Sequence, residues 1–282
     1  MVTYPLPDSE QIHARYQDSF YSPEGERFSK SAERVSRFFR TQRASYVERV
    51  LGRKGSILDV GCGRGIMIHE LRKRGWQVAG TQVSATAGSY IRKAFGIDCF
   101  VGELPHAPFK RRSFDIVTMW HVLEHLRDPL LYLRCCRGLL KPGGYLLIEI
   151  PNAGSWSARM TKTAWMGWDP LHHLHHYTPR TLGLALQKTG FSPISWDSLS
   201  WEYGPFITLQ SLLNLFMRRD ALFEHLMIVR QQRGARRRGY RQGALLFLHA
   251  FFGAIPALFI SVFSAACGCG EVIRVIAQAT DA

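Results

Sequence analysis

Residues 58–65 decide the fold, and they read Leu58-Asp59-Val60-Gly61-Cys62-Gly63-Arg64-Gly65. They end an apolar segment that we predict as a strand, Ser56–Val60, and they open a segment with helical periodicity, about 66–74. A strand that leads through a glycine loop into a helix is typical of α/β folds that hold nucleotide-like ligands. The glycines allow close approach of the backbone, and the helix N-terminus offers free N–H groups.

The spacing of the glycines narrows the class of ligand. Gly-x-Gly-x-Gly differs from the Gly-x-Gly-x-x-Gly of dinucleotide-binding folds. Asp59 precedes the first glycine by two residues. A carboxylate there would repel a pyrophosphate, whereas it suits a ligand whose amino-acid end carries an ammonium group.

Strands and helices alternate after this loop, which predicts a parallel sheet built from βαβ units. After the first strand, the predicted strands are Gln77–Thr81, Asp98–Val101, Phe114–Met119, Gly144–Ile150, Ser192–Ser200 and Glu271–Gln278. The predicted helices cover about 66–74, 84–95, 128–139 and 180–189. Lys141-Pro142-Gly143-Gly144 is predicted as a turn before the fifth strand.

Three motifs carry a resemblance to a known family. LDVGCGRG at 58–65 resembles motif I of the class I S-adenosylmethionine (SAM) methyltransferases. The segment 120–126, WHVLEHL, is similar to the vLEHl segment of small-molecule and quinone-type members, and HHLHHYTP at 172–179 to the HLxHyTP stretch of a bacterial subgroup. The resemblance implies an α/β, Rossmann-like, seven-stranded, mostly parallel sheet with flanking helices, and SAM as cofactor.

The same resemblance implies a set of cofactor-binding residues. Gln82 stands where the family has an acid that binds the ribose hydroxyls, and a neutral amide makes a weaker contact there. Glu103 and Leu104 match the positions that meet the adenine, while Trp120 and His121 would border the adenine and the transferred methyl group. The full expected set is Asp59, Gly61, Cys62, Gly63, Gly65, Gln82, Val83, Glu103, Leu104, Trp120 and His121.

Histidines are the candidate catalytic residues, because methyl transfer often needs a base and histidine titrates in the useful range. The loop after the fifth predicted strand carries four of them, of which His173 and His176 match the family positions. We take His173, His176 and His121 as candidates. The alternative is that these side chains only orient a helix or bind backbone carbonyls.

A metal site is the remaining chemical possibility for this region. His121, Glu124 and His125 are close in sequence and resemble the E-x-x-E-H arrangement of some magnesium-dependent methyltransferases, with a loop histidine to complete the set. His121 replaces the first acid, which favours a softer ion such as zinc or no ion. Relatives without metal carry the same LEH residues, so the sequence predicts no metal.

Bulk composition indicates a globular and strongly basic protein. The 282 residues are 46% hydrophobic and carry a formal net charge of +14, which favours nucleic acid, an anionic membrane surface or an acidic substrate as partner. The six cysteines form no C-x-x-C pair, as expected for reduced thiols in a cytosolic protein. The first residues lack the apolar core of a signal peptide.

Four parts can be distinguished along the chain. They are a helical leader or cap (1–52), the SAM-binding core (53–202), a helical insertion (203–270) and the last core strand (271–282). The leader contains an amphipathic run at Ser31–Leu51, which would either cap the substrate side or simply pack on the sheet.

The insertion combines apolar and basic segments. An amphipathic stretch, Phe206–Met217, precedes an arginine-rich run, and Ala244–Cys267 then carries no formal charge. Both flanking strands must return to one sheet, so we expect residues 206–267 to contact an anionic membrane from one side. Pro256 suggests a helical hairpin or a kinked helix, while a buried helical pair or a dimer interface remains the alternative. The run comprises Arg230, Arg233, Arg236, Arg237, Arg238 and Arg241.

The expected function is transfer of a methyl group from SAM to an oxygen or nitrogen of a small or lipid-linked acceptor, in the cytoplasm at the inner face of the membrane. Two alternatives stay open: an RNA methyltransferase that uses the basic surface, and a non-catalytic SAM-binding or membrane scaffold. The Asn/Asp-Pro-Pro-aromatic motif of base-modifying enzymes is missing after the fourth strand. Nucleic acid is therefore not the expected partner.

Overall fold

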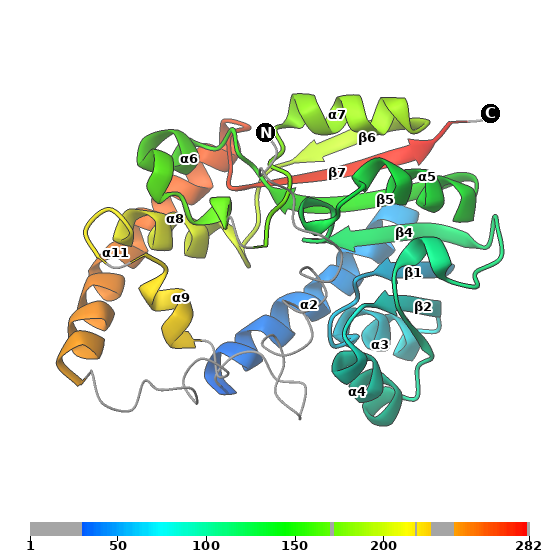
Figure 1. Ribbon diagram of the computed structural model, residues 1–282, viewed down its shortest axis with the longest axis horizontal. Coiled ribbons are helices and arrows are strands. Elements are labelled where there is room, and N and C mark those ends of the chain that lie inside the picture. Colours follow the sequence, from blue (N-terminus) through cyan, green and yellow to red (C-terminus); the bar gives the residue numbers. More distant parts are fainter. Residues whose placement is uncertain (1–29, 170–171, 218, 227–239, 281–282) are drawn as a thin grey trace.

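The computed structural model describes residues 30–169, 172–217, 219–226 and 240–280, and these form a seven-stranded sheet flanked by helices (Figure 1). The strand order is β3-β2-β1-β4-β5-β7-β6. Strands β1 to β5 pair in parallel, and β7 lies antiparallel between β5 and β6. This confirms the predicted fold class. The strands are β1 (Ser56–Val60), β2 (Gln77–Gln82), β3 (Cys99–Val101), β4 (Phe114–Trp120), β5 (Leu140–Pro151), β6 (Phe191–Asp197) and β7 (Val272–Ala279).

Helices cover both faces of the sheet and enclose two apolar layers. Helices α2 (Lys30–Leu51), α3 (Ile66–Lys73) and α4 (Ala85–Phe95) pack on one face, and α5 (Pro129–Leu139) and α7 (Pro179–Lys188) pack on the other. Every residue of β1 and β4 is buried, as expected for central parallel strands covered on both sides. These two strands therefore give the functional region a rigid base.

Two strand boundaries differ from the sequence-based prediction by three or four residues, whereas every other boundary agrees to within one residue. Strand β5 begins at Leu140 instead of Gly144, because a bulge opposite Phe114 and Ile116 admits the predicted turn residues into the strand. Strand β6 ends at Asp197 instead of Ser200. The Asp197 side chain accepts a hydrogen bond from the Leu199 backbone N–H at 2.9 Å, and this turn ends the strand.

A separate group of helices lies beside the sheet, at the left of Figure 1. It consists of α6 (Trp156–Thr161), α8 (Gly204–Leu213), α9 (Ala221–Leu226) and α11 (Tyr240–Ala266). Helix α11 packs on α8 through small residues, since a Cβ on Gly204 would lie only 2.5 Å from the Ser261 hydroxyl. Short 3-10 helices complete the structure: η1 (Leu104–His106), η2 (Leu123–His125), η3 (Lys162–Ala164) and η4 (Met166–Trp168).

The predicted helical hairpin in the insertion is wrong for the residues described. Helix α11 is a single helix that continues through Pro256. One side of it is covered by α8, while eight large apolar side chains on α11 remain exposed. They are Leu248, Phe251, Phe252, Ile255, Leu258, Phe259, Val262 and Phe263.

Within the ranges described, no helix is both long enough and apolar enough to cross a bilayer. Residues 1–29 of the predicted leader, and Arg230 to Arg238 of the predicted basic run, lie outside the described residues.

Candidate functional site

A cleft of about 1330 Å³ opens at the carboxyl ends of β1 and β4. Its walls come from the glycine loop after β1, from helix α2, from the loop after β4 and from the helical group around α8 and α9. Ligands of open α/β sheets bind in this crevice, where the strand order reverses. Most of the predicted site residues line it: Asp59, Gly61, Cys62, Gly63, Gln82, Val83, Glu103, Leu104, Trp120, His121 and His173.

The glycine loop has the backbone geometry of a close ligand cradle. Gly61, Gly63 and Gly65 have φ values of 68°, 57° and 68°, which disfavour any residue with a side chain. A Cβ on Gly61 would lie 2.6 Å from a methyl group of Val122. Gly65, at the start of α3, instead packs against Ile91 of α4 and is not among the residues that line the cleft. The loop therefore fits a ligand that contacts the backbone of residues 61–63.

Asp59 brings a buried carboxyl group to the base of this cradle. It is 4% exposed and lies beside Thr118 of β4, whose hydroxyl donates a hydrogen bond to it at 2.7 Å. Burial raises the pKa of Asp59 to about 7, although Thr118, Arg43 and Arg40 act in the opposite direction. A cationic ligand group would stabilise the ionised form, which matches the ammonium group of SAM.

Gln82 closes the side of the cradle that faces β2. Its amide nitrogen donates to the Gly63 carbonyl at 3.4 Å, and its amide oxygen accepts from the Ser84 backbone N–H at 3.3 Å. Ser84 in turn caps helix α4. Gln82 thus holds the loop and α4 together and has a polar group at the cleft, where the family has an acid.

His121 is held between two buried carboxylates. Its Nδ1 lies 3.3 Å from Glu124 and its Nε2 lies 3.2 Å from Glu149. Burial lowers the pKa of His121, but Tyr203, Glu124 and Glu149 outweigh this and raise the pKa to about 10. The residue also has φ of 55°, which is strained for a side chain of this type. With both ring nitrogens engaged, this geometry does not suit a general base.

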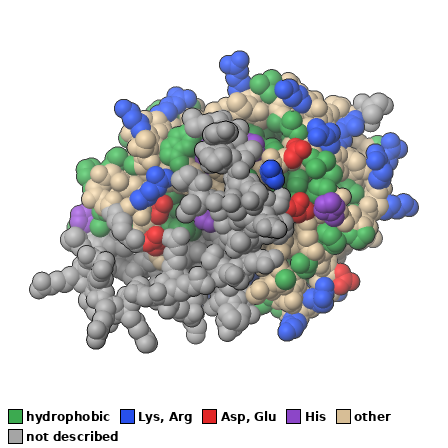
Figure 2. Space-filling view, in the orientation of Figure 1, with side chains coloured by type: hydrophobic (Ala, Val, Ile, Leu, Met, Phe, Trp, Pro, Cys, Tyr) green, Lys and Arg blue, Asp and Glu red, His purple; other side chains and the backbone are tan. Residues whose placement is uncertain are grey.

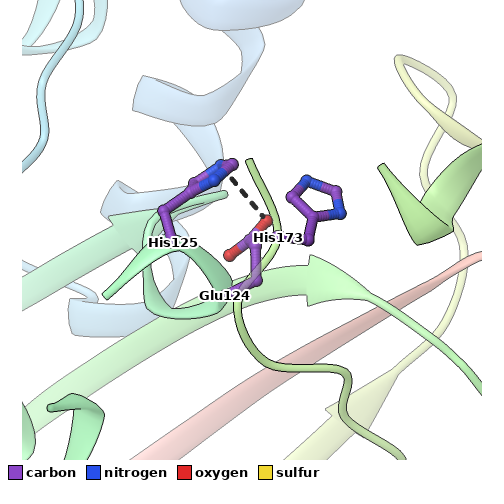
Figure 3. Close-up of side chains that lie close together, drawn as sticks. All are labelled: Glu124, His125 and His173. Carbon is purple, nitrogen blue, oxygen red and sulfur yellow. Dashed lines mark ion pairs between the residues drawn. The ribbon is translucent and has the colours of Figure 1, made fainter. Parts of the chain in front are cut away.

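The other two candidate histidines differ in position. His173 lines the cleft next to two side chains of η2 (Figure 3), and its Nδ1 lies 2.8 Å from the Gly167 carbonyl oxygen. His176 is not among the cleft-lining residues and packs edge-on against Trp168. Burial, followed by the nearby His173, lowers the pKa of His176 to about 4. Of the two, the structure brings only His173 to the cleft.

Residues outside the family motifs also reach the cleft, and the sequence patterns did not predict them. Arg43 of α2 forms an ion pair of 2.6 Å with Glu202, and its guanidinium lies 4.6 Å from the centre of the Trp120 ring. Arg40 and Tyr203 line the same cleft. The helical spacing of Ser36, Arg40 and Arg43 could have predicted a polar face of α2 directed at the cleft, because these three positions lie on one side of the helix. No motif marks Glu202 or Tyr203.

Comparisons with known proteins agree with this geometry. A family model described as a methyltransferase domain matches residues 24–195, which is more than half of the chain. The chain therefore belongs to the methyltransferase-domain family, within the class I SAM-dependent methyltransferases. SAM is the cofactor of this family.

Two curated relatives illustrate the similarity in sequence. The chain is 28% identical over 163 residues to the ubiquinone biosynthesis O-methyltransferase of Cereibacter sphaeroides, covering 52% of this chain and 66% of the relative. It is 31% identical over 120 residues to the protein of the same name from Marinobacter nauticus, covering 39% and 50%. The chain thus spans between half and just under two thirds of the length of these relatives.

Two solved structures show the same fold at low sequence identity. One is the 1,6-didemethyltoxoflavin-N1-methyltransferase of Burkholderia thailandensis, with a TM-score of 0.57 at 13% identity, covering 99% of this chain and 94% of that one. The other is the phosphoethanolamine N-methyltransferase 2 of Haemonchus contortus, with a TM-score of 0.55 at 16% identity, covering 85% and 53%.

Proposed function

We propose that this protein transfers a methyl group from SAM to an oxygen, or to a nitrogen, of a small or lipid-linked acceptor bound in the cleft. The observation that carries the proposal is that the glycine loop and His173 line the same cleft. Its volume of about 1330 Å³ exceeds the 300–1,000 Å³ typical of a pocket for one drug-sized ligand. It therefore has room for a cofactor and an acceptor together.

The cofactor would lie along the carboxyl ends of β1, β2 and β3. The backbone of Gly61 to Gly63 and the Asp59 carboxylate would hold its amino-acid end, and Arg40 of α2 supplies a cation close enough to lower the pKa of Asp59. Gln82 and Glu103 offer polar groups for the ribose and the adenine, and Leu104 is buried next to them. When bound, SAM supplies the electrophilic methyl group.

The acceptor would occupy the side of the cleft between α2 and the helical group. Tyr203 and Trp120 offer aromatic surface there, and His173 is the candidate histidine that can approach the proton of an acceptor hydroxyl. The curated relatives are O-methyltransferases of ubiquinone biosynthesis by name, which supports oxygen as the accepting atom. We therefore favour a hydroxyl group as nucleophile.

The lipid-linked acceptor is supported by helix α11. Its exposed side presents several phenylalanines, among them Phe251 at 74% and Phe259 at 77% exposure. An apolar surface of this kind on a helix is typical of contact with a membrane interface. The arginine-rich run precedes α11 in the sequence except for Arg241, which lies at the start of this helix, and the run would favour anionic head groups. We propose that the protein works in the cytoplasm, at the inner face of the membrane.

A scattered charge pattern argues against the RNA alternative. On the face drawn in Figure 2, the described Lys and Arg side chains are spread out and interrupted by hydrophobic groups instead of gathered in one groove. Nucleic-acid binding without sequence preference usually combines a basic groove with stacking aromatic side chains. The described part of this face offers no such groove.

Calorimetric titration of SAM and S-adenosylhomocysteine, followed by an acceptor screen, tests the proposal. We expect both compounds to bind the wild-type protein and the Asp59→Ala variant to bind SAM at least about tenfold more weakly, because a buried charged contact is lost. The screen would measure S-adenosylhomocysteine release with hydroxylated aromatic compounds, with and without an isoprenoid chain, and with RNA. Folded protein that binds neither compound would support the scaffold alternative, and turnover with RNA alone would overturn the proposed acceptor.

A further inference from the structure

Two cysteine side chains meet beside the glycine loop. The sulfur atoms of Cys62, in that loop, and of Cys99, at the start of β3, lie 3.5 Å apart. Both are free thiols, and 37 residues separate them in the sequence. Cys62 lines the cleft, whereas Cys99 is 5% exposed. Two thiols in contact, one of which borders an open cleft, have the arrangement of a cysteine pair that oxidises reversibly.

Strand β2 positions the two cysteines on its two sides. The Cys62 N–H donates a hydrogen bond to the Thr81 carbonyl at 3.0 Å, which continues the pairing of β1 with β2. On the other side of β2, Cys99 pairs with Gly80. A Cβ on Gly80 would lie only 2.8 Å from the Cys62 sulfur. The glycine at position 80 therefore leaves the space in which the Cys62 side chain reaches across β2 to Cys99.

The contact between the thiols favours the first step of an oxidation, in which a thiolate is the nucleophile. A hydrogen bond donated by the Cys62 thiol lowers the pKa of Cys99, although burial acts in the opposite direction. The same hydrogen bond, followed by burial, raises the pKa of Cys62. Cys99 is therefore the thiol that loses its proton first, and Cys62 retains a proton that the reaction can use.

We propose that Cys62 and Cys99 are a site of reversible oxidation by a small hydroperoxide, and that the disulfide they form weakens the binding of SAM. The effect on SAM rests on the proposed function, which places the cofactor on the backbone of residues 61–63. The two sulfur atoms must approach from 3.5 Å to about 2.05 Å to form the bond. Cys62 is the middle residue of the cradle between Gly61 and Gly63, so its displacement changes the backbone that would hold the cofactor.

The oxidation balances with the hydroperoxide as oxidant. The Cys99 thiolate attacks one oxygen of hydrogen peroxide, the O–O bond breaks, and Cys99 becomes a sulfenic acid. The leaving hydroxide takes the proton of the Cys62 thiol and becomes water. The Cys62 thiolate then attacks the Cys99 sulfur, so that the S–S bond forms as the S–O bond breaks, and the second hydroxide takes the proton that Cys99 released. A dithiol reductant restores both thiols and becomes a disulfide itself.

Bound SAM should in turn protect the thiols, because the coupling between two equilibria is reciprocal. If the disulfide form binds SAM about tenfold more weakly, saturating SAM makes the reduction potential of the pair about 30 mV more positive. Redox titration in dithiothreitol buffers, with and without SAM, measures this shift without an acceptor and without turnover. A thiol pair that only fills space would have the same potential in both titrations.

The probe for the site is hydrogen peroxide, added in small molar excess to the reduced protein. Peptide mass spectrometry after alkylation identifies the disulfide, and calorimetry measures SAM affinity before and after treatment with dithiothreitol. We expect a disulfide between Cys62 and Cys99 and a SAM affinity lowered at least about tenfold, with recovery on reduction. Cys99→Ser should keep its SAM affinity after the same treatment. The matched control, Cys267→Ser at an exposed cysteine, should lose SAM affinity as the wild type does.

The outcomes separate this inference from the proposed function. Absence of the disulfide in peroxide-treated wild type, or an equal loss of SAM affinity in Cys99→Ser, would overturn the oxidation site. A disulfide that leaves SAM affinity unchanged would overturn its effect on the cofactor. Cys99→Ala is the second variant in case serine destabilises this buried position. If the reduced wild type does not bind SAM, the proposed function fails, while the mass spectrum still reports whether the two thiols oxidise.

Discussion

Asp59 shows how a single buried residue can connect ligand binding to pH. Its carboxyl group lies next to Thr118 and below the glycine loop, and burial raises its pKa to about 7. In the unfolded chain the pKa is near 3.8. The folded protein therefore holds more protons than the unfolded chain between about pH 4 and 7, so the free energy of unfolding falls as pH rises through that window.

We predict that SAM binding strengthens as pH rises toward 7, because the cofactor's ammonium group favours ionised Asp59. Below pH 7, binding should release a proton, which calorimetry detects by repeating the titration in buffers of different ionisation enthalpy. Ligand-free protein should lose stability by up to about 1.4 kcal/mol per pH unit in the window. The Asp59→Asn variant should show neither effect, and equal pH profiles for both proteins would contradict the prediction.

Gly61 offers a second test at this scale, with a matched control in the same chain. Gly61 and Gly52 have φ values of 68° and 69°, but only a Cβ on Gly61 would collide, at 2.6 Å from Val122. The left-handed backbone costs any other residue about 1–2 kcal/mol. We predict that Gly52→Ala shows only this loss of stability, whereas Gly61→Ala also binds SAM at least tenfold more weakly. Equal SAM affinities in a calorimetric comparison would refute a cradle at residues 61–63.

The sequence predicted side-chain positions well where a motif fixes the backbone, and less well elsewhere. Asp59 lies at the end of β1 and Gly61 to Gly63 follow this strand directly, so their placement at the cleft follows from the strand's end. His121 looked like a possible base because the sequence cannot show that Glu149, on the neighbouring strand, takes its second nitrogen. Arg43 and Glu202 are far apart in sequence and meet only through the packing of α2 against the helical group.

At the scale of elements, helix α2 is tied to the glycine loop by a buried ion pair. Arg64 in the loop contacts Glu33 of α2, and both side chains are less than 10% exposed. Arg64 also donates a hydrogen bond to the Tyr90 hydroxyl at 2.9 Å. Removing one partner of a buried pair leaves an uncompensated charge, which is more costly than losing both.

We predict that Glu33→Gln lowers the free energy of unfolding by about 3–5 kcal/mol. The surface pair of exposed Lys73 and half-buried Glu70 provides the control, and Glu70→Gln should cost at most about 1 kcal/mol. Replacing both buried partners, as Glu33→Leu with Arg64→Met, should recover most of the loss. Chemical denaturation measures all three variants, and a Glu33→Gln cost no larger than that of Glu70→Gln would contradict the role of the ion pair.

Most elements could be predicted, because apolar strands and capped helices leave local signals. The helix after β2 begins within one residue of its predicted start because the Ser84 hydroxyl, at the N-cap, accepts a hydrogen bond from the Ala87 N–H. The start of β5 was missed because a bulge absorbs the turn residues, and a bulge depends on the partner strand. The single helix α11 was missed because Pro256 is normally read as a break, while packing against α8 keeps the helix continuous.

At the scale of the whole molecule, we predict that the protein binds membranes through the exposed apolar side of α11. We expect co-sedimentation with vesicles that contain phosphatidylglycerol, and weaker binding to neutral vesicles. Changing Phe251 and Phe259 together to Asp should reduce vesicle binding at least about 100-fold, since each buried phenylalanine contributes about 1.5–3 kcal/mol. The control is Ile194→Asp on β6, where an apolar residue is 55% exposed away from α11. If both variants bind vesicles like the wild type, α11 does not mediate the contact.

The antiparallel position of β7 has a consequence for how the chain folds. β7 lies between β5 and β6, so Arg274 pairs with Glu149 and Asp197, which are 125 and 77 residues earlier. During synthesis, β1 to β5 can assemble as soon as they emerge, whereas β6 has no partner until β7 arrives. Pairings of such long range form slowly, and an open strand edge invites association with other chains. The helical group that forms one wall of the cleft lies between β5 and β7 in the sequence, so it is synthesised before β7 completes the sheet. The pairing of β7, the last strand to form, then fixes the position of this group.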